Sequence, residues 1–120
     1  MNIDSERIGG SILKISLSGR MDVAGVQQID RKVADLTAPP CRAVIIELSK
    51  VDFLTSVGIR MLLIIAKALH GRGGRVVLLN PNPVVTRILE LAGVDTTISV
   101  FHDVETACTA LTAKPVGGGA

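Results

Sequence analysis

Apolar and polar residues alternate with a period of two at the start of the chain, which is typical of β-strands. This pattern predicts strands over residues 1–7 and 11–18, the second with Ile15 and Leu17 between polar neighbours. The two strands flank Gly9-Gly10, a dipeptide that tolerates the positive φ angles of a tight turn. The chain is therefore expected to begin with an antiparallel hairpin.

After the hairpin, apolar residues recur at spacings of three and four, which is typical of amphipathic helices. This period predicts four helices, at about residues 24–36, 56–70, 80–91 and 103–111. Short apolar runs between them predict strands at residues 43–48, 76–79 and 97–100. Strands separated by helical crossovers pair in parallel. We therefore predict an α/β fold whose sheet is mixed and mostly parallel, with an antiparallel hairpin strand at its beginning.

The predicted helices have recognisable starts and buried faces. Asp22, at the end of a predicted turn over residues 19–22, is expected to cap the first helix, because Asp accepts hydrogen bonds from the first backbone N–H groups. The side chains expected to point inward are Val26, Ile29, Val33 and Leu36 in the first helix, and Val84, Ile88 and Leu91 in the third.

The length of the chain fits one domain. With 120 residues it is long enough for one sizeable hydrophobic core and too short for two. We assign residues 1–113 to this domain and expect residues 114–120, which are rich in Gly and lack apolar periodicity, to form a flexible tail. The apolar fraction of 48% predicts strands that are buried on both faces.

Charge and composition argue against several classes of function. The net charge of +2 arises from 13 basic and 11 acidic residues without a basic cluster, and only two residues are aromatic, so nucleic-acid binding is not expected. No stretch approaches the roughly 18 apolar residues of a membrane span, so direct membrane insertion is not expected either. Because the first residues also lack the features of a signal peptide, we predict a cytoplasmic protein.

Cysteine and histidine positions form no metal or redox motif. Cys41 and Cys108 stand alone without CxxC spacing, and neither His70 nor His102 has a suitably spaced second ligand. We therefore expect no metal and no cofactor. An enzyme that used Ser56 as its nucleophile would need a base, which neither histidine is placed to supply, so catalysis is not expected.

The segment Val51–Arg60 carries a predicted strand into a turn with two hydroxyls and then into a long apolar helix. Thr55 and Ser56 fall where the N-cap of that helix is expected. A hydroxyl at this position is often only a cap. The unpaired N–H groups and the positive end of the helix dipole also stabilise an anion there, so Ser56 is a candidate phosphorylation site.

Two patterns place other residues near this candidate site. Loops that follow parallel strands meet at one edge of a sheet, which predicts that Asp22, Ser56 and Asn80 share one surface. In the helix after Ser56, Arg60 and Lys67 mark the solvent-facing stripe, and the apolar residues Leu63 and Ile64 flank it. These two side chains either form a docking surface or belong to a wide buried face.

Several motifs in this order resemble the STAS domain of bacterial anti-sigma factor antagonists. The resemblance covers roughly residues 3–112, and its motifs are Gly19–Asp22, Val44–Leu48, Val51–Arg60, Gly74–Leu78 and Leu89–Val94. It implies that the protein binds an anti-sigma factor with an ATP-binding serine kinase fold and thereby frees a sigma factor. It also implies that phosphorylation at the position of Ser56 ends the complex and that a serine phosphatase restores it.

The resemblance and the helix pattern together suggest a partner-binding surface made of Asp22, Thr55, Ser56, Val57, Gly58, Arg60, Leu63 and Ile64. Thr55 and Val57 depart from the family, which often has Asp before the serine and Ser or Thr after it, and Thr55 becomes a second possible phosphate acceptor. An alternative function is a STAS subunit of a membrane transport complex, especially for lipids, that binds its ATPase without phosphorylation. Whether the domain forms a homodimer is left open.

Overall fold

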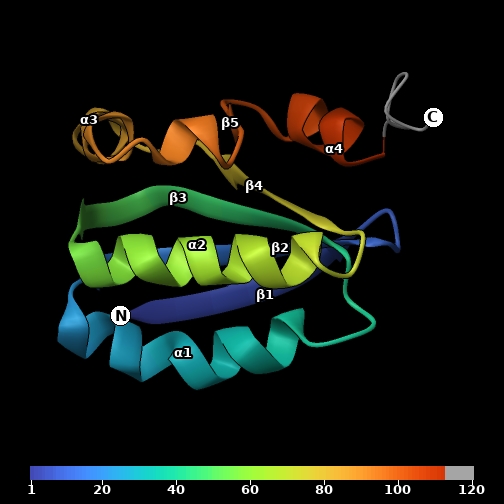
Figure 1. Cartoon of the computed structure of the whole chain (residues 1–120), viewed down its shortest axis with the longest axis horizontal. Coiled ribbons are helices and arrows are strands. Elements are labelled where there is room, and N and C mark those ends of the chain that lie inside the picture. The colour runs from blue at the N-terminus through green and yellow to red at the C-terminus, as the bar shows by residue number, and fades with distance from the viewer. Residues whose placement is uncertain (113–120) are drawn as a thin grey trace.

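The computed structural model describes residues 1–112 and confirms the predicted α/β class (Figure 1). In chain order the elements are β1 (Asn2–Ile8), β2 (Ile12–Met21), α1 (Val23–Thr37), β3 (Ala43–Leu54), α2 (Ser56–His70), β4 (Arg75–Leu79), α3 (Pro83–Leu91), the short 3₁₀ helix η1 (Val94–Thr96), β5 (Val100–Phe101) and α4 (Val104–Thr112). The five strands lie in the order β1-β2-β3-β4-β5, with β1 antiparallel to β2 and the other pairs parallel. The predicted tail, residues 114–120, lies outside the described residues.

The central strands bury side chains on both faces of the sheet, as the apolar composition predicts. On one face, Val44 and Ile46 of β3 belong to the larger core, which α1, α2 and α3 cover. On the other face, Ile45 of β3 packs in a smaller core with Ala107 of α4. Figure 1 shows α1 and α2 side by side on the sheet, so a surface between these two helices faces solvent.

Strands β2 and β3 extend beyond their predicted ends, and this changes the region next to Ser56. We predicted a turn over residues 19–22 and a strand end at Leu48, but the two strands stay paired as far as Met21 and Leu54. The register of the two strands shifts twice, and each shift places one extra residue in β3, so that its buried residues Leu48, Val51 and Leu54 come three apart and not two. The sequence pattern hides the continuation because such bulges break the period of two.

The buried face of α3 was predicted wrongly. Val84 and Leu91 are 54% and 72% exposed, and Val85 and Leu89 fill the core instead, with Ile88 partly buried. The final strand was also misplaced: residues 94–96 form η1, and β5 covers only Val100–Phe101.

A side-chain anchor sets the rotation of α3 about its axis. The Asn82 side chain accepts a hydrogen bond from the Val85 N–H and donates one to the Val51 carbonyl oxygen, at 2.8 and 2.7 Å. The apolar residues of α3 form two possible buried stripes, offset by one position in the sequence. The contact with β3 turns one of these stripes toward the core. Periodicity alone does not distinguish them.

Helix α2 approaches the ends of β2 and β3 closely because its first turn contains Gly58. This glycine is buried, and a β-carbon added to it would lie 2.7 Å from Cδ1 of Leu54 and 2.9 Å from Cβ of Met21. Atoms at these separations overlap, so any larger residue would push the start of α2 away from the sheet. Gly58 therefore helps to fix where Ser56 lies.

We expect Gly58→Ala to lower the free energy of unfolding by about 1–2 kcal/mol, because overpacking typically costs 1–3 kcal/mol and the helix propensity of Ala returns at most about 1 kcal/mol. Gly71→Ala, at the other end of α2, is the matched control: Gly71 has φ of −63°, and its added β-carbon would make an ordinary 3.5 Å contact. Urea denaturation of both variants measures the difference. Equal stabilities of Gly58→Ala and the unsubstituted protein would contradict the close packing.

Candidate functional site

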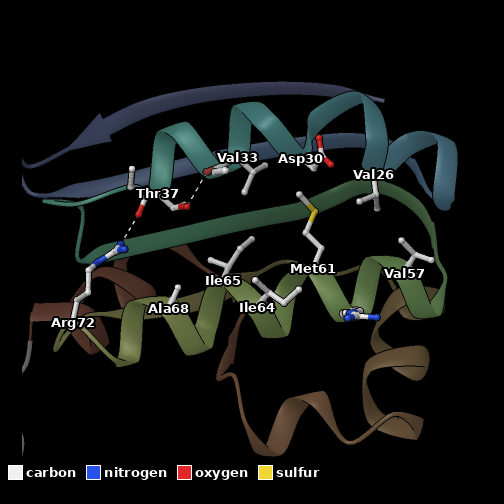
Figure 2. A pocket seen from close by; sticks show the side chains of 13 residues that line it. Val26, Asp30, Val33, Thr37, Val57, Met61, Ile64, Ile65, Ala68 and Arg72 are labelled. Atoms are coloured by element: carbon white, nitrogen blue, oxygen red, sulfur yellow. Dashed lines mark hydrogen bonds between the residues drawn. The ribbon is translucent and has the colours of Figure 1, made fainter.

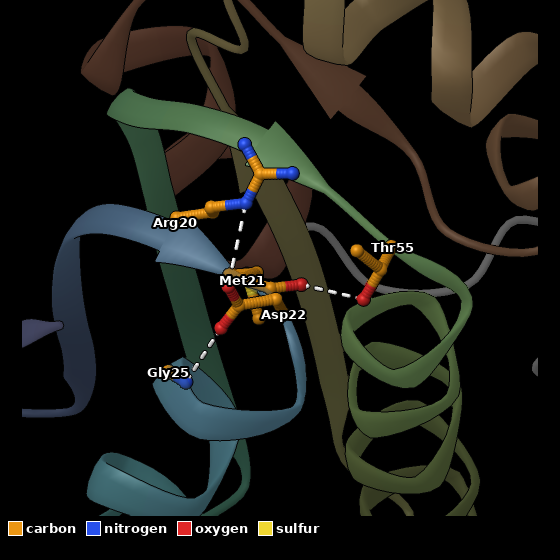
Figure 3. A network of polar contacts seen from close by, with 5 residues as sticks. All are labelled: Arg20, Met21, Asp22, Gly25 and Thr55. Atoms are coloured by element: carbon orange, nitrogen blue, oxygen red, sulfur yellow. Dashed lines mark hydrogen bonds and ion pairs between the residues drawn. The ribbon is translucent and has the colours of Figure 1, made fainter.

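The start of α2 is attached to the end of β2 through Thr55. The hydroxyl of Thr55 donates to the Met21 carbonyl oxygen at 2.8 Å (Figure 3), and the backbone N–H of Thr55 donates to the same oxygen at 3.1 Å. Thr55 occupies the N-cap position, as predicted, but its side chain makes no capping hydrogen bond. The first N–H groups of α2 are therefore without the side-chain acceptor that a cap normally provides.

Ser56 is the first residue of α2, and it is exposed. Among residues 1–112, its hydroxyl makes no hydrogen bond, in contrast to that of the neighbouring Thr55. The uncapped helix start also keeps its positive partial charge available to an anion. Ser56 thus combines an exposed side chain with a helix terminus that is favourable for negative charge.

Asp22 has the capping role that the sequence predicts. Its carboxylate accepts from the Gly25 N–H at 2.8 Å and forms an ion pair with Nε of Arg20 at 3.3 Å (Figure 3). The guanidinium of Arg20 lies 4.6 Å from the centre of the Phe53 ring, which is partly exposed. The carboxylate of Asp22 is thus held in place beside Met21, one residue from the anchor of Thr55.

Sequence reasoning did not find Arg20 and Phe53 as members of this surface. Arg20 pairs with Phe53 in the register of β2 and β3, but only in the part of these strands that extends beyond their predicted ends. If the predicted strands had extended further, an arginine opposite an aromatic residue would have indicated this contact.

A mostly apolar groove of about 420 Å³ runs between α1 and α2 (Figure 2). Its floor includes Val26 and Val33 of α1 and Met61 and Ile65 of α2. Among the residues predicted to bind a partner, Val57, Arg60 and Ile64 line this groove, and Ile64 is 58% exposed. The structure therefore brings these three side chains of α2 together on one concave surface.

The remaining predicted residues lie elsewhere. Leu63 is 36% exposed but lines a different groove, of about 500 Å³, together with Lys67 and His70. Gly58 lies in the interior, so its contribution is to the position of α2. Leu63 and Ile64, which flank the stripe of Arg60 and Lys67, are thus both exposed, as a docking surface requires. They line two different grooves, however.

One arginine closes the far end of the α1–α2 groove. Arg72, just beyond α2, donates through Nη2 to the carbonyl oxygens of Thr37 and Cys41, the second at 3.0 Å. These carbonyls belong to the end of α1 and the segment that follows it, so Arg72 holds the C-terminal ends of the two helices together.

Within residues 1–112, His, Cys, Asp and Glu side chains nowhere gather in the groups of three or more that hold a metal ion. Partial burial raises the pKa of the Cys41 thiol above its ordinary value, which favours the unreactive thiol form. None of the helices in the described part of the chain has the length and apolar character to cross a membrane.

We expect Thr55→Val to lower the free energy of unfolding by about 1 kcal/mol, because it removes a partly buried hydrogen bond and keeps the side-chain shape. Thr109→Val is the matched control, since the hydroxyl of Thr109 makes only a local, exposed bond to the Glu105 carbonyl in α4, and its loss should cost less than about 0.5 kcal/mol. Urea denaturation measures both. Equal losses would show that the bond to Met21 contributes no more than a local one.

Comparison with known proteins gives relatives along almost the whole chain. The sequence model of the STAS domain matches residues 2–107. BtrV of Bordetella bronchiseptica, which is named as an anti-sigma factor antagonist, is 28% identical over 116 residues, covering 96% of this chain and 99% of BtrV.

Solved structures agree with this match. An anti-sigma factor antagonist from Mycobacterium paratuberculosis is 25% identical, with a TM-score of 0.85 and coverage of 93% of this chain and 94% of that one. The phosphorylated form of the Bacillus cell fate determinant SpoIIAA shares the fold at 23% identity, with a TM-score of 0.69 and coverage of 91% and 98%. The chain belongs to the STAS domain family.

Proposed function

We propose that this protein is an anti-sigma factor antagonist, a regulatory binding module that is switched by phosphorylation of Ser56. It binds an anti-sigma factor with an ATP-binding serine kinase fold and frees the sigma factor. Similarity to BtrV and to the Mycobacterium paratuberculosis antagonist supports this function. The observation that carries the proposal is the exposed hydroxyl of Ser56, without an internal hydrogen bond in the described residues, at the uncapped start of α2. Sigma factors act inside the cell, so the function implies a cytoplasmic protein.

Phosphorylation of Ser56 requires only access to its oxygen. The bond from Oγ to the γ-phosphorus of ATP forms, the bond from that phosphorus to ADP breaks, and the hydroxyl proton passes to a base of the kinase. Thr55 is a poorer acceptor, because its hydroxyl is already bonded to the Met21 carbonyl oxygen and would have to leave it. The exposure of Ser56 equally suits removal of the phosphate by a serine phosphatase.

The switch is electrostatic. A phosphate adds about −1.5 to −2 charges at neutral pH. On the free protein the helix dipole and the first N–H groups of α2 stabilise this charge, so no refolding is needed. At a packed interface the same charge has to lose its water and faces any acidic group of the partner, which weakens the complex.

The partner surface that we propose consists of Ser56 and two groups of neighbours. One group is Val57, Arg60 and Ile64 with the rest of the α1–α2 groove, and the other is Asp22, the N-cap of α1, with Arg20. The groove supplies apolar area, and the charged residues supply direction and register.

Incubation with the cognate kinase and ATP, followed by mass spectrometry, should give one phosphate, on Ser56. We expect Ser56→Ala to abolish labelling and Thr55→Ala to retain it. Labelling that survives Ser56→Ala and disappears in Thr55→Ala would move the acceptor to Thr55. If no cognate kinase labels the protein, a STAS subunit that binds a transporter ATPase without phosphorylation becomes the better function.

The negative charge at Ser56 should act on binding and not on folding. We expect Ser56→Asp to weaken the complex with the anti-sigma factor at least about tenfold, which corresponds to about 1.4 kcal/mol. Ser11→Asp is the matched control, because Ser11 is exposed at the β1–β2 turn, at the opposite edge of the sheet. Isothermal titration calorimetry with each variant gives the comparison, and equal affinities for the two would contradict an electrostatic switch at Ser56.

A further inference from the structure

Ser56 and Arg60 lie one turn apart on the same face of α2. They are separated by four residues in one continuous helix, and both are exposed. Side chains at this spacing are neighbours, with β-carbons roughly 5–6 Å apart. A group attached to the oxygen of Ser56 is therefore within reach of the long side chain of Arg60.

Arg60 is also a cation without an ionic partner among residues 1–112. The ion pairs there involve other residues, namely Lys14 with Glu6, Arg20 with Asp22, and Arg31 with Asp35. Helix α2 has no acidic residue in its first turn, and its sequence contains no Asp or Glu at all. Its other basic groups, Lys67 and His70, lie in its last turns. Arg60 is thus the only basic side chain that the helix places one turn from Ser56.

We propose that Arg60 is the internal counter-ion of phosphorylated Ser56. This inference rests on the proposed function, since it requires a phosphate on Ser56. A guanidinium matches the geometry of phosphate with two parallel N–H donors, which a lysine cannot supply. The order is favourable as well, because an anion on the N-terminal side of a cation at this spacing agrees with the helix dipole. The pair forms within α2 and moves no backbone.

The pairing changes what the α1–α2 groove presents to a partner. Arg60 lines this groove, and in the unmodified protein its positive charge is free to meet a carboxylate of the partner. Phosphorylation takes the combined charge of Ser56 and Arg60 from +1 to roughly −0.5 to −1 at neutral pH. The modification therefore both adds a negative charge and withdraws the cation at the groove. A partner that uses an acidic side chain there would lose its contact.

The second ionisation of the phosphate tests this pairing without a kinase or a partner. Phosphoserine is placed at position 56 of the full chain during synthesis, and ³¹P NMR follows the phosphate through a pH titration. Pairing with Arg60 favours the dianion and so lowers the second pKa of the phosphate. We expect Arg60→Gln to raise that pKa by about 0.2–0.7 unit, the size typical of an exposed ion pair, and Arg60→Lys to raise it by less.

Lys67→Gln is the matched control, because it removes the same charge from the same helix. Lys67 lies eleven residues beyond Ser56, about 16 Å along the axis, which exceeds the screening length of roughly 10 Å in 0.1 M salt. The phosphate pKa should therefore equal that of the unsubstituted phosphoprotein. Circular dichroism of each variant confirms that α2 is still folded.

Equal phosphate pKa values in the unsubstituted protein and Arg60→Gln would overturn the pairing, and so would equal rises in Arg60→Gln and Lys67→Gln. A second readout is the side-chain Nε–H resonance of Arg60, which should shift as the phosphate loses its second proton. The result is separable from the proposed function. A kinase that fails to label Ser56 refutes phosphoregulation, whereas the titration of the synthetic phosphoprotein still reports whether Arg60 pairs with the phosphate.

Discussion

The carbonyl oxygen of Met21 joins the end of β2 to the start of α2, and the placement of the candidate site depends on this join. It accepts from the N–H and the hydroxyl of Thr55. Gly58 allows the helix to approach closely enough for both bonds. One consequence is that the threonine hydroxyl is occupied and the serine hydroxyl beside it is not. The fold thus distinguishes two chemically similar neighbours by giving only Thr55 a partner in the sheet.

This arrangement separates the stability of the fold from the switch that we propose at Ser56. A serine that capped α2 would contribute to helix stability, and its modification would cost that contribution. Here the anchor is Thr55, so the oxygen of Ser56 has no structural task in the described residues. Negative charge can then be added at Ser56 without loss of a folding contact. The same logic applies on the other side of the site, where Asp22 is committed to capping α1 and to Arg20.

Much of the fold could be predicted because most helices and strands bury one face, and the buried residues recur with the period of that element. The order of strands and helices, the antiparallel hairpin and the Asp22 cap all follow from local pattern. The errors arise where a long-range contact overrides the pattern. Bulges hid the continuation of β2 beside β3, and the bond from Asn82 to the Val51 carbonyl chose the inward face of α3.

The same distinction between local pattern and long-range contact explains why only part of the candidate site was predicted. The position of Ser56 at a strand–helix junction is a local feature, and spacing found it. Arg20 and Phe53 meet only through the register of two strands, and Leu63 and Ile64 fall into different grooves because the packing of α2 sets its rotation. Neither fact can be read from the order of residues within one element.

The bridge from Arg72 to the carbonyls of Thr37 and Cys41 has a consequence for the rate at which a partner could associate. It fixes the spacing of the two helices at one end of their groove, independently of any occupant. A surface shaped in advance loses little conformational freedom when it is covered. Encounter would then be governed by diffusion and charge, and differences in affinity among partners would arise mainly from how slowly each one dissociates.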